Sequence, residues 1–214
     1  MRKFVINLKR RPDRLEQFFK RCPYPQECIE VIHGFDSKFP KNESSKERKM
    51  RSKFKSDITA GPQGCSISHM RVWKKMVNEN IPIAMIFEDD AMFNEDFYDF
   101  MESLEIPENV NMLFFGGRFN KDFKPPPETM KFLNSKIYQH IIDIWDNRIH
   151  ERTGHGYILT SKMAKFLLEV FNIKDDNREI DHHIIHTLKE LKIPYHSTYP
   201  LVCWCPFVSE SDSR

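Results

Sequence analysis

The chain has 214 residues, of which 33 are Lys or Arg and 31 are Asp or Glu, for a formal net charge of +2. This length favours a single domain, and a 40% hydrophobic content with 18 Phe suffices for a core, which excludes a wholly disordered protein. The balanced charge argues against a general nucleic-acid-binding protein, because phosphate contacts demand an excess of basic residues.

The sequence gives no indication of membrane insertion or export. No apolar run approaches the roughly 20 residues that a membrane helix needs. The apolar stretch near the N-terminus has the length of a strand and is followed at once by charged residues, which is unlike a signal peptide. Five cysteines without a secretory signal favour free thiols in a reducing compartment. We therefore expect a cytoplasmic protein with no membrane span, which is compatible with peripheral binding at a membrane surface.

Strands and helices alternate along the chain. Lys3–Leu8 predicts a buried strand, Pro12 marks the start of a helix, and Glu30–His33 predicts a second strand. The other predicted elements are helices over 66–78, 94–104, from 161 onward and over 180–191, and strands over 81–87, 111–115, 137–144, 156–159 and 198–204. This order is typical of one α/β domain, here residues 1–214, with a mostly parallel central sheet.

Residues 38–57 are expected to form a basic loop. Between Lys41 and Lys55 the sequence has seven Lys or Arg, two Glu and few apolar residues. Such a composition is typical of a solvated loop or a frayed helix. The alternative is a mobile basic loop beside an anionic ligand.

The most prominent polar motif is Glu88-Asp89-Asp90, directly after the predicted strand 81–87. In an open α/β sheet, ligands bind beyond the carboxyl ends of the strands. Three adjacent carboxylates repel one another, and oxygen ligands on a short turn suit Mg²⁺ or Mn²⁺, which can in turn neutralise a diphosphate. The alternative is a solvated acidic turn before the next helix.

Two glycine-containing motifs could also approach a ligand. Gly61-Pro-Gln-Gly64 predicts a turn before a helix whose first residues include a serine, and the free N–H groups there could bind an anion or a sugar. The alternative is an ordinary helix cap by Ser66. Near residue 155, Gly154 and Gly156 flank His155 and allow close backbone approach, or they form a plain turn before a strand.

Several segments together resemble glycosyltransferase family 25, which includes lipopolysaccharide-type and procollagen galactosyltransferases. The resemblance covers nearly the whole chain. It rests on Val5-Ile-Asn-Leu8 with Arg11 and Arg14, Gly61 to Cys65 with Ser68-His69 and Trp73, Phe87 to Asp90, Gly156 to Leu159, Asp181, and Ser211-Asp212. Two departures stand out: Pro62-Gln63 replaces a Glu-Ile pair, and Ile180 replaces a proline.

The resemblance implies a GT-A, Rossmann-like fold and an inverting transfer of a hexose, galactose or glucose, from a UDP-sugar to a glycan, lipopolysaccharide-like or protein acceptor. It also implies Mn²⁺ or Mg²⁺ as the cofactor. The implied site is Asp181 as the catalytic base; Asn7, Arg11, Ser68, Glu88, Asp89 and Asp90 at the donor nucleotide; Glu88 and Asp90 at the metal; and His155, Gly156 and Asp212 on the acceptor or sugar side.

Two other functions fit the same residues. A divalent-metal phosphohydrolase could use Glu88–Asp90 with His155, and it would hydrolyse a nucleotide-sugar without preference for an acceptor. A non-catalytic nucleotide-sugar-binding module would bind the donor and never consume it. The replaced glutamate at Pro62-Gln63 and the basic segment are compatible with such a module.

Overall fold

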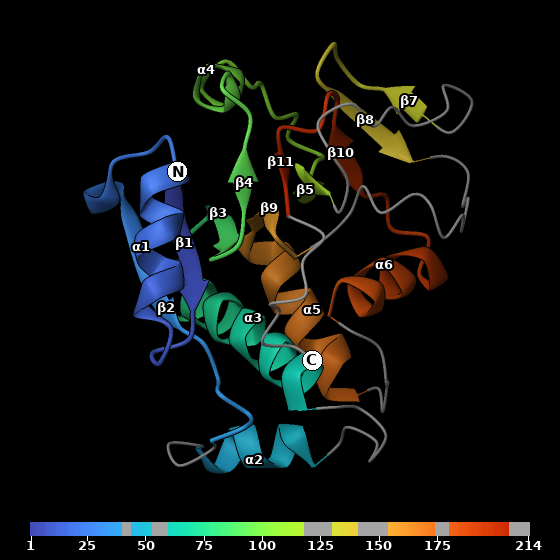
Figure 1. The fold of residues 1–214 in the computed structure, drawn as a ribbon. Helices are drawn as coiled ribbons and strands as arrows, with labels where there is room; N and C mark the ends of the chain where they lie inside the picture. Colours follow the sequence, from blue (N-terminus) through green and yellow to red (C-terminus); the bar gives the residue numbers. More distant parts are fainter. Residues whose placement is uncertain (40–43, 53–59, 118–129, 141–153, 174–179, 206–214) are drawn as a thin grey trace.

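The computed structural model describes residues 1–39, 44–52, 60–117, 130–140, 154–173 and 180–205, which form an α/β fold (Figure 1). The strands are β1 (Arg2–Asn7), β2 (Ile29–His33), β3 (Ile83–Glu88), β4 (Met92–Phe93), β5 (Met112–Phe114), β6 (Gly116–Gly117), β7 (Met130–Phe132), β8 (Ile137–His140), β9 (Gly156–Thr160), β10 (His196–Thr198) and β11 (Cys203–Trp204). The helices are α1 (Pro12–Arg21), α2 (Ser45–Arg51), α3 (Ala60–Asn78), α4 (Phe97–Glu102), α5 (Ser161–Ile173) and α6 (Ile180–Glu190), with a 3-10 turn at Gln26–Cys28. Within the described part of the chain, no helix combines the length and apolarity that a membrane span requires.

The central sheet has eight strands in the order β2-β1-β3-β9-β5-β10-β8-β7. As expected, β1 pairs in parallel with β2 and β3, and β5 pairs in parallel with β10. However, β9 lies antiparallel between β3 and β5, and β8 is antiparallel to both β10 and β7. The α/β fold is thus confirmed, but the sheet is mixed rather than mostly parallel. The sequence of β9 hides this, because the strand is buried on both faces and reads like a parallel one.

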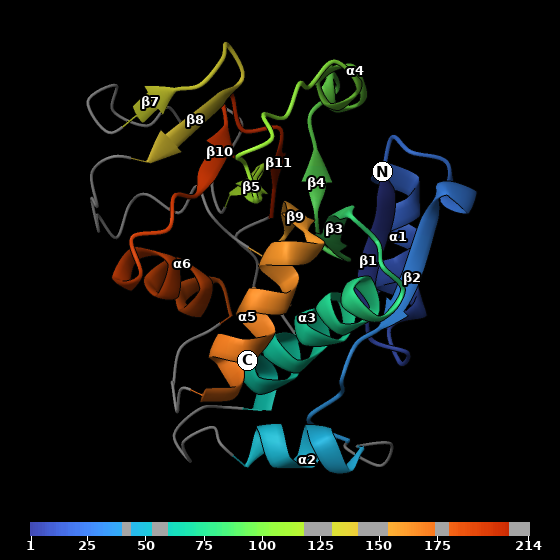
Figure 2. The same cartoon turned by 180° about the vertical axis from the view of Figure 1, so that it is seen from behind.

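Helices cover both faces of this sheet, and alternate residues of its strands face different helices. Phe4 and Ile6 pack in the core with α3, α5 and α6, whereas the intervening Val5 packs in a second core with α1 and α4. Figures 1 and 2 show these two layers from opposite sides, with α1 in front in the first view and α3 and α5 in front in the second. This alternation is what a strand with both faces buried requires.

The predicted turn at Gly61-Pro-Gln-Gly64 is wrong, because these residues form the first turns of α3. Proline is tolerated there, since the first N–H groups of a helix have no partner within the helix. Gly64 has a separate role: a Cβ at this position would lie 2.8 Å from the carbonyl oxygen of Phe35 and 2.9 Å from Ser37 Oγ. Glycine therefore lets the start of α3 approach the segment after β2.

The basic segment 38–57 contains a helix where a loop was expected. Residues 45–51 form α2, while 40–43 and 53–57 lie outside the described residues. Ser44 and Glu47 form a reciprocal capping box: Ser44 N donates to Glu47 Oε2 at 2.9 Å, and Glu47 N donates to Ser44 Oγ at 3.2 Å. Arg71 of α3 adds an ion pair to Glu47 Oε1 at 2.6 Å. These contacts order a helix that composition alone does not predict.

One smaller difference concerns the closing strand. The predicted closing strand 198–204 is two short strands, β10 in the central sheet and β11 in a three-stranded sheet of order β4-β11-β6. Pro200 lies between them, and proline has no N–H to give to a continuous ladder. All five cysteines are free thiols, as expected.

Candidate active site

The acidic residues Glu88, Asp89 and Asp90 lie where three strands of the central sheet meet. β3 ends at Glu88, which pairs with Ile6 near the end of β1. The antiparallel β9 begins on the other side of β3, where Gly156 pairs with Phe87. The mixed sheet therefore brings the start of β9, and with it His155, to the edge at which the parallel strands end. Glu88 N donates to the His155 carbonyl oxygen at 3.2 Å.

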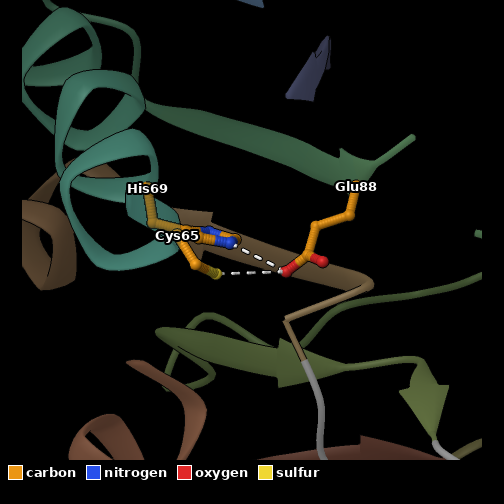
Figure 3. A group of neighbouring side chains, drawn as sticks. All are labelled: Cys65, His69 and Glu88. Carbon is orange, nitrogen blue, oxygen red and sulfur yellow. Dashed lines mark hydrogen bonds and ion pairs between the residues drawn. The ribbon is translucent and has the colours of Figure 1, made fainter. Parts of the chain in front are cut away.

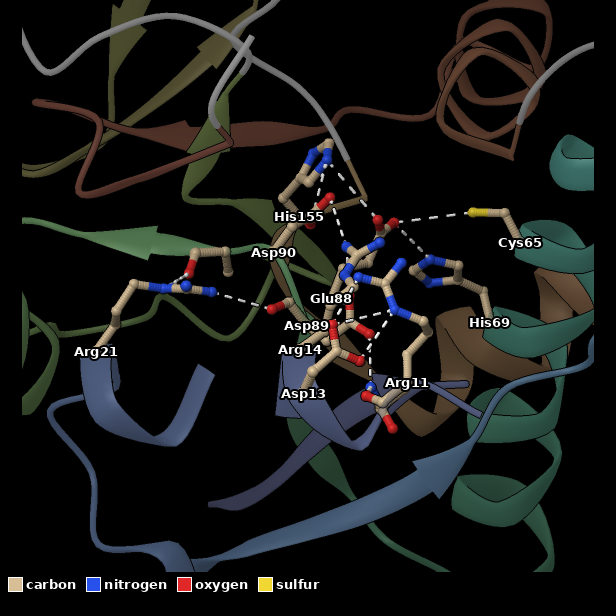
Figure 4. Close-up of polar contacts among 12 residues, drawn as sticks. Arg11, Asp13, Arg14, Arg21, Cys65, His69, Glu88, Asp89, Asp90 and His155 are labelled. Carbon is tan, nitrogen blue, oxygen red and sulfur yellow. Dashed lines mark hydrogen bonds and ion pairs between the residues drawn. The ribbon is translucent and has the colours of Figure 1, made fainter. Parts of the chain in front are cut away.

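Glu88, Asp90 and His155 form a compact group whose ligand atoms lie within 4.8 Å of one another. His155 Nε2 is 3.7 Å from Glu88 Oε2 and 3.6 Å from Asp90 Oδ1 (Figure 4). Burial alone would lower the pKa of His155, but the carboxylates of Asp90 and Glu88 raise it well above its usual value. A positive charge is therefore strongly favoured between these two carboxylates.

Asp90 has a buried oxygen that accepts no hydrogen bond from the described residues, although His155 Nε2 lies 3.6 Å from it. Its Oδ1 atom is inaccessible to solvent and has no hydrogen-bond donor. Its other oxygen, Oδ2, lies 3.0 Å from the guanidinium of Arg14. A buried acceptor without a donor is costly, so this atom is suited to a ligand that supplies positive charge.

Asp89 points into the protein and connects β3 to β1 and α1. Its side chain accepts a hydrogen bond from Asn7 Nδ2 at 2.7 Å and pairs with Arg14 at 2.5 Å, and Arg21 donates to its carbonyl oxygen at 3.1 Å. Burial raises the pKa of Asp89 to about 7 against the opposing effect of Arg14. Asp89 and Asn7, both predicted at the donor nucleotide, are thus buried and bonded to each other.

Arg11 and Arg14 bring positive charge to the acidic group. Arg11 pairs with Asp13 at 2.8 Å. It also lies close enough to Arg14 for its positive charge to oppose the rise in the pKa of Arg14 that the acidic group causes. Figure 4 shows both side chains rising from the start of α1 towards Glu88 and Asp89. Arg14 was quoted among the family motifs but not predicted as a site residue. The sequence feature that could have indicated it is its spacing of three residues from Arg11, which is about one helical turn.

The start of α3 contributes His69 and Cys65 rather than the predicted Ser68. Ser68 Oγ donates to the Gly64 carbonyl oxygen at 2.5 Å and accepts a hydrogen bond from Phe35 N at 2.8 Å, so it holds α3 against the segment after β2. His69 Nε2 lies 3.0 Å from Glu88 Oε1, and Cys65 Sγ lies 3.8 Å from the same oxygen (Figure 3). The sequence signal for both was their spacing of four residues, which places them on one helix face.

Gly154 and Gly156 both allow close approach, but to protein groups. A Cβ on Gly154 would lie 2.5 Å from Glu88 Oε1 and 3.3 Å from His69 Nε2. A Cβ on Gly156 would lie 2.4 Å from the ring of Phe115. The first glycine therefore makes room for the site, whereas the second makes room for the core.

The predicted base and the predicted terminal residue are not joined to this group by any described contact. Asp181 lies in the first turn of α6, and its Oδ1 accepts a hydrogen bond from the His182 N–H at 2.8 Å. Asp212 lies outside the described residues. The roles given to these two residues remain predictions.

Three of the family motifs, those that contain Arg14, His69 and Glu88 to Asp90, meet at one edge of the sheet, and the sequence comparison agrees with the resemblance. Residues 1–195 match the family described as "Glycosyltransferase family 25 (LPS biosynthesis protein)". The chain belongs to glycosyltransferase family 25. The resemblance of its motifs to this family is therefore confirmed.

Curated relatives of this family 25 chain come from animals and bacteria. It is 28% identical over 139 residues to procollagen galactosyltransferase 2 of Mus musculus, covering 59% of this chain and 22% of that protein. It is 31% identical over 131 residues to lipooligosaccharide biosynthesis protein lex-1 of Haemophilus influenzae, covering 56% and 40%. It is 32% identical over 184 residues to procollagen galactosyltransferase 1 of Danio rerio, covering 80% and 29%. The matches thus span 22% to 40% of these relatives' own lengths.

Proposed function

We propose that this family 25 chain is a glycosyltransferase that binds a nucleotide-sugar at the Glu88–Asp90 edge of the sheet. In this proposal the donor is a UDP-hexose carrying galactose or glucose, and the fold is of the GT-A type. The acceptor is a hydroxyl on a glycan, a lipopolysaccharide-like molecule or a protein, in keeping with the names of its relatives. The observation that carries the proposal is the buried, donor-free Oδ1 of Asp90 between Glu88 and His155.

The residues at this edge fit a divalent cation. Glu88, Asp90 and His155 offer two carboxylate oxygens and one imidazole nitrogen, a donor set that suits Mn²⁺. The carboxylates of Glu88 and Asp90 that raise the pKa of His155 stabilise positive charge here, and a cation bound at His155 Nε2 would take the place of its proton. Bound there, Mn²⁺ would neutralise the diphosphate of the donor.

The protein's own groups would then perform the transfer. Arg14, held between Asp89 and Asp90, and the neighbouring Arg11 supply positive charge near the departing diphosphate. An acceptor hydroxyl attacks the anomeric carbon on the face opposite the diphosphate, so that a new C–O bond forms as the bond to the diphosphate oxygen breaks. Asp181 is the proposed base that takes the hydroxyl proton. The product has an inverted anomeric configuration.

The first test measures binding of UDP with and without Mn²⁺ by thermal unfolding. A ligand that binds the native state alone raises its stability, by about 2.7 kcal/mol at 100 times the Kd. We expect UDP to stabilise the wild type more with Mn²⁺ than with EDTA, and Asp90→Ala to abolish the difference. Asp99→Ala, at an exposed aspartate on α4, is the matched control and should keep it. Equal stabilisation by UDP in EDTA would refute the cation site.

The second test separates transfer from the two alternatives. UDP-galactose and UDP-glucose are incubated with Mn²⁺ and a panel of glycan and procollagen-derived peptide acceptors, and products are identified by mass spectrometry. A glycosylated acceptor supports the proposal. Release of hexose 1-phosphate and UMP at the same rate with every acceptor identifies a phosphohydrolase, and a donor that binds without being consumed identifies a binding module.

A further inference from the structure

A row of buried polar groups connects the interior of the protein to Glu88. Trp73 Nε1 donates to the Tyr157 hydroxyl at 3.0 Å, and that hydroxyl lies 2.8 Å from His69 Nδ1. The other ring nitrogen of His69 lies 3.0 Å from Glu88 Oε1. Trp73, Tyr157 and His69 are at most 1% exposed, so solvent does not compete for these bonds.

The first bond of this row fixes the direction of the others. An indole N–H can only donate, so the Tyr157 oxygen accepts from Trp73. The hydroxyl proton then needs an acceptor, and among the described residues the second partner of the hydroxyl is His69 Nδ1. Nδ1 must therefore be unprotonated, which makes His69 the neutral tautomer with its proton on Nε2. Nε2–H in turn donates to Glu88 Oε1.

We propose that His69 is a positioning residue, fixed in its Nε2–H tautomer by Trp73 and Tyr157, that holds Glu88 with one oxygen towards α3 and the other towards Asp90 and His155. Oε1 accepts from His69 and lies 3.8 Å from the Cys65 thiol, and Oε2 is the oxygen nearest to His155. The inference rests on the proposed function, because the oriented Oε2 is a proposed cation ligand. Second partners of metal ligands act in this way by fixing orientation.

The same geometry argues against a second metal site at Cys65, His69 and Glu88, which also have ligand atoms within 4.8 Å of one another. A metal on His69 Nε2 would require the proton to move to Nδ1. The Tyr157 oxygen would then accept two hydrogen bonds, from Trp73 and His69, and its own proton would be buried without an acceptor among the described residues. The row of hydrogen bonds thus favours a donor, not a ligand, at His69.

The first experiment observes the His69 tautomer in metal-free wild-type protein by long-range ¹H–¹⁵N NMR, assigned with His69→Gln. We expect one neutral species with its proton on Nε2. Tyr157→Phe leaves Nδ1 buried without a donor and should remove this single species. An Nδ1–H or doubly protonated ring in the wild type would overturn the proposal, as would coordination of added Zn²⁺ by His69 and Cys65. The wild-type spectrum decides the question even if the variant fails to fold.

The second experiment measures Mn²⁺ affinity by electron paramagnetic resonance. Tyr157→Phe should weaken Mn²⁺ binding by about 10- to 100-fold, the usual effect of losing an outer partner of a metal ligand. In a His69→Gln background, where no tautomer needs fixing, the same substitution should have a much smaller effect. Tyr138→Phe, at a fully buried tyrosine on β8, is the control and should leave the affinity unchanged.

Unchanged Mn²⁺ affinity in a folded Tyr157→Phe protein would overturn the positioning role. A wild type that binds no Mn²⁺ would instead refute the cation site of the proposed function. In that case the tautomer still decides whether His69 fixes Glu88, so the two failures are distinguishable.

Discussion

Glu88 separates two polar groups that are similar in composition and opposite in how their atoms are partnered. On the α3 side, the donors of Trp73, Tyr157 and His69 each meet an acceptor, ending at Glu88 Oε1. On the other side, Asp90 Oδ1 is buried with no donor, 3.6 Å from His155 Nε2. Each side also has a trio with metal-ligand spacing: Cys65, His69 and Glu88 on the α3 side, and Glu88, Asp90 and His155 on the other.

The difference supports the proposed cation site on the Asp90 side. A buried polar atom left without a partner costs roughly 1–3 kcal/mol, and beside Glu88 and His155 a bound cation would recover that cost. The row from Trp73 to Glu88 Oε1 has no unpartnered donor, so its hydrogen bonds hold one conformation. Both groups contain residues that can bind a metal, so residue types alone do not distinguish them. They differ in which of their polar atoms already have hydrogen-bond partners.

The largest expected effect concerns a residue outside both groups. If both sides of Glu88 serve the donor, the base that activates the acceptor comes from elsewhere, and Asp181 is the proposed one. Asp181→Asn should lower kcat by about 10²–10⁴-fold, the usual contribution of a general base, with donor affinity nearly unchanged. Asparagine caps helices about as well as aspartate, so a purely capping Asp181 predicts near-normal turnover. Steady-state kinetics with a fixed acceptor distinguish the two.

The next effect concerns stability and the core side of the strand β9. Gly156→Ala would place a Cβ 2.4 Å from the Phe115 ring, which is fully buried and cannot move freely. We expect a loss of about 1–3 kcal/mol in the free energy of unfolding, measured by urea denaturation, because overpacking a dense core forces strain. Wild-type stability in this variant would show that the Phe115 region is looser than the structure indicates.

Gly154→Ala should weaken Mn²⁺ binding while leaving the stability of the protein nearly unchanged. Its Cβ would lie 2.5 Å from Glu88 Oε1, the far end of a side chain that can swing aside. The free energy of unfolding should therefore change little, while Mn²⁺ affinity should fall by about 10-fold as the carboxylate leaves its position. Together the two alanine variants separate the site from the core within three residues. Equal losses of stability in both would contradict this division.

Much of the fold follows from hydrophobic periodicity, because β1, α1, β2 and the body of α3 are amphipathic or continuously apolar segments with clear boundaries. The direction of β9 does not, because burial on both faces erases the alternation that marks an antiparallel strand. The composition of α2 fits a solvated loop or a frayed helix equally well, and what decides for the helix is a capping box and a tertiary ion pair.

The site shows a similar limit. The acidic residues after β3 and the histidine before β9 were predicted, since a strand end followed by polar residues is a local pattern. His69 and Arg14 were not, because their roles depend on which side chain lies across from them. The prediction names Ser68, but its neighbour His69 is the residue that contacts Glu88. Adjacent residues of a helix face different directions, and Ser68 bonds to Gly64 and Phe35 instead.

The smallest expected effect concerns Glu47, an acid whose two carboxylate oxygens both have partners, as Glu88 Oε1 has on the α3 side. Its bonds to Arg71 and Ser44 outweigh burial and lower its pKa to about 2. A carboxyl whose pKa is lower in the folded state stabilises the protein above its unfolded pKa of about 4.5, and this contribution disappears as the pH falls towards 2. Glu47→Gln keeps one acceptor oxygen for the capping box with Ser44, and it removes the charge and the acceptor that face Arg71. The variant should be less stable than the wild type by up to about 1 kcal/mol at pH 7, and the gap should close as the pH falls from about 5 towards 2 in urea denaturation. A gap that stays constant across this range would assign the stabilisation to the shape of the side chain rather than to its ion pair with Arg71.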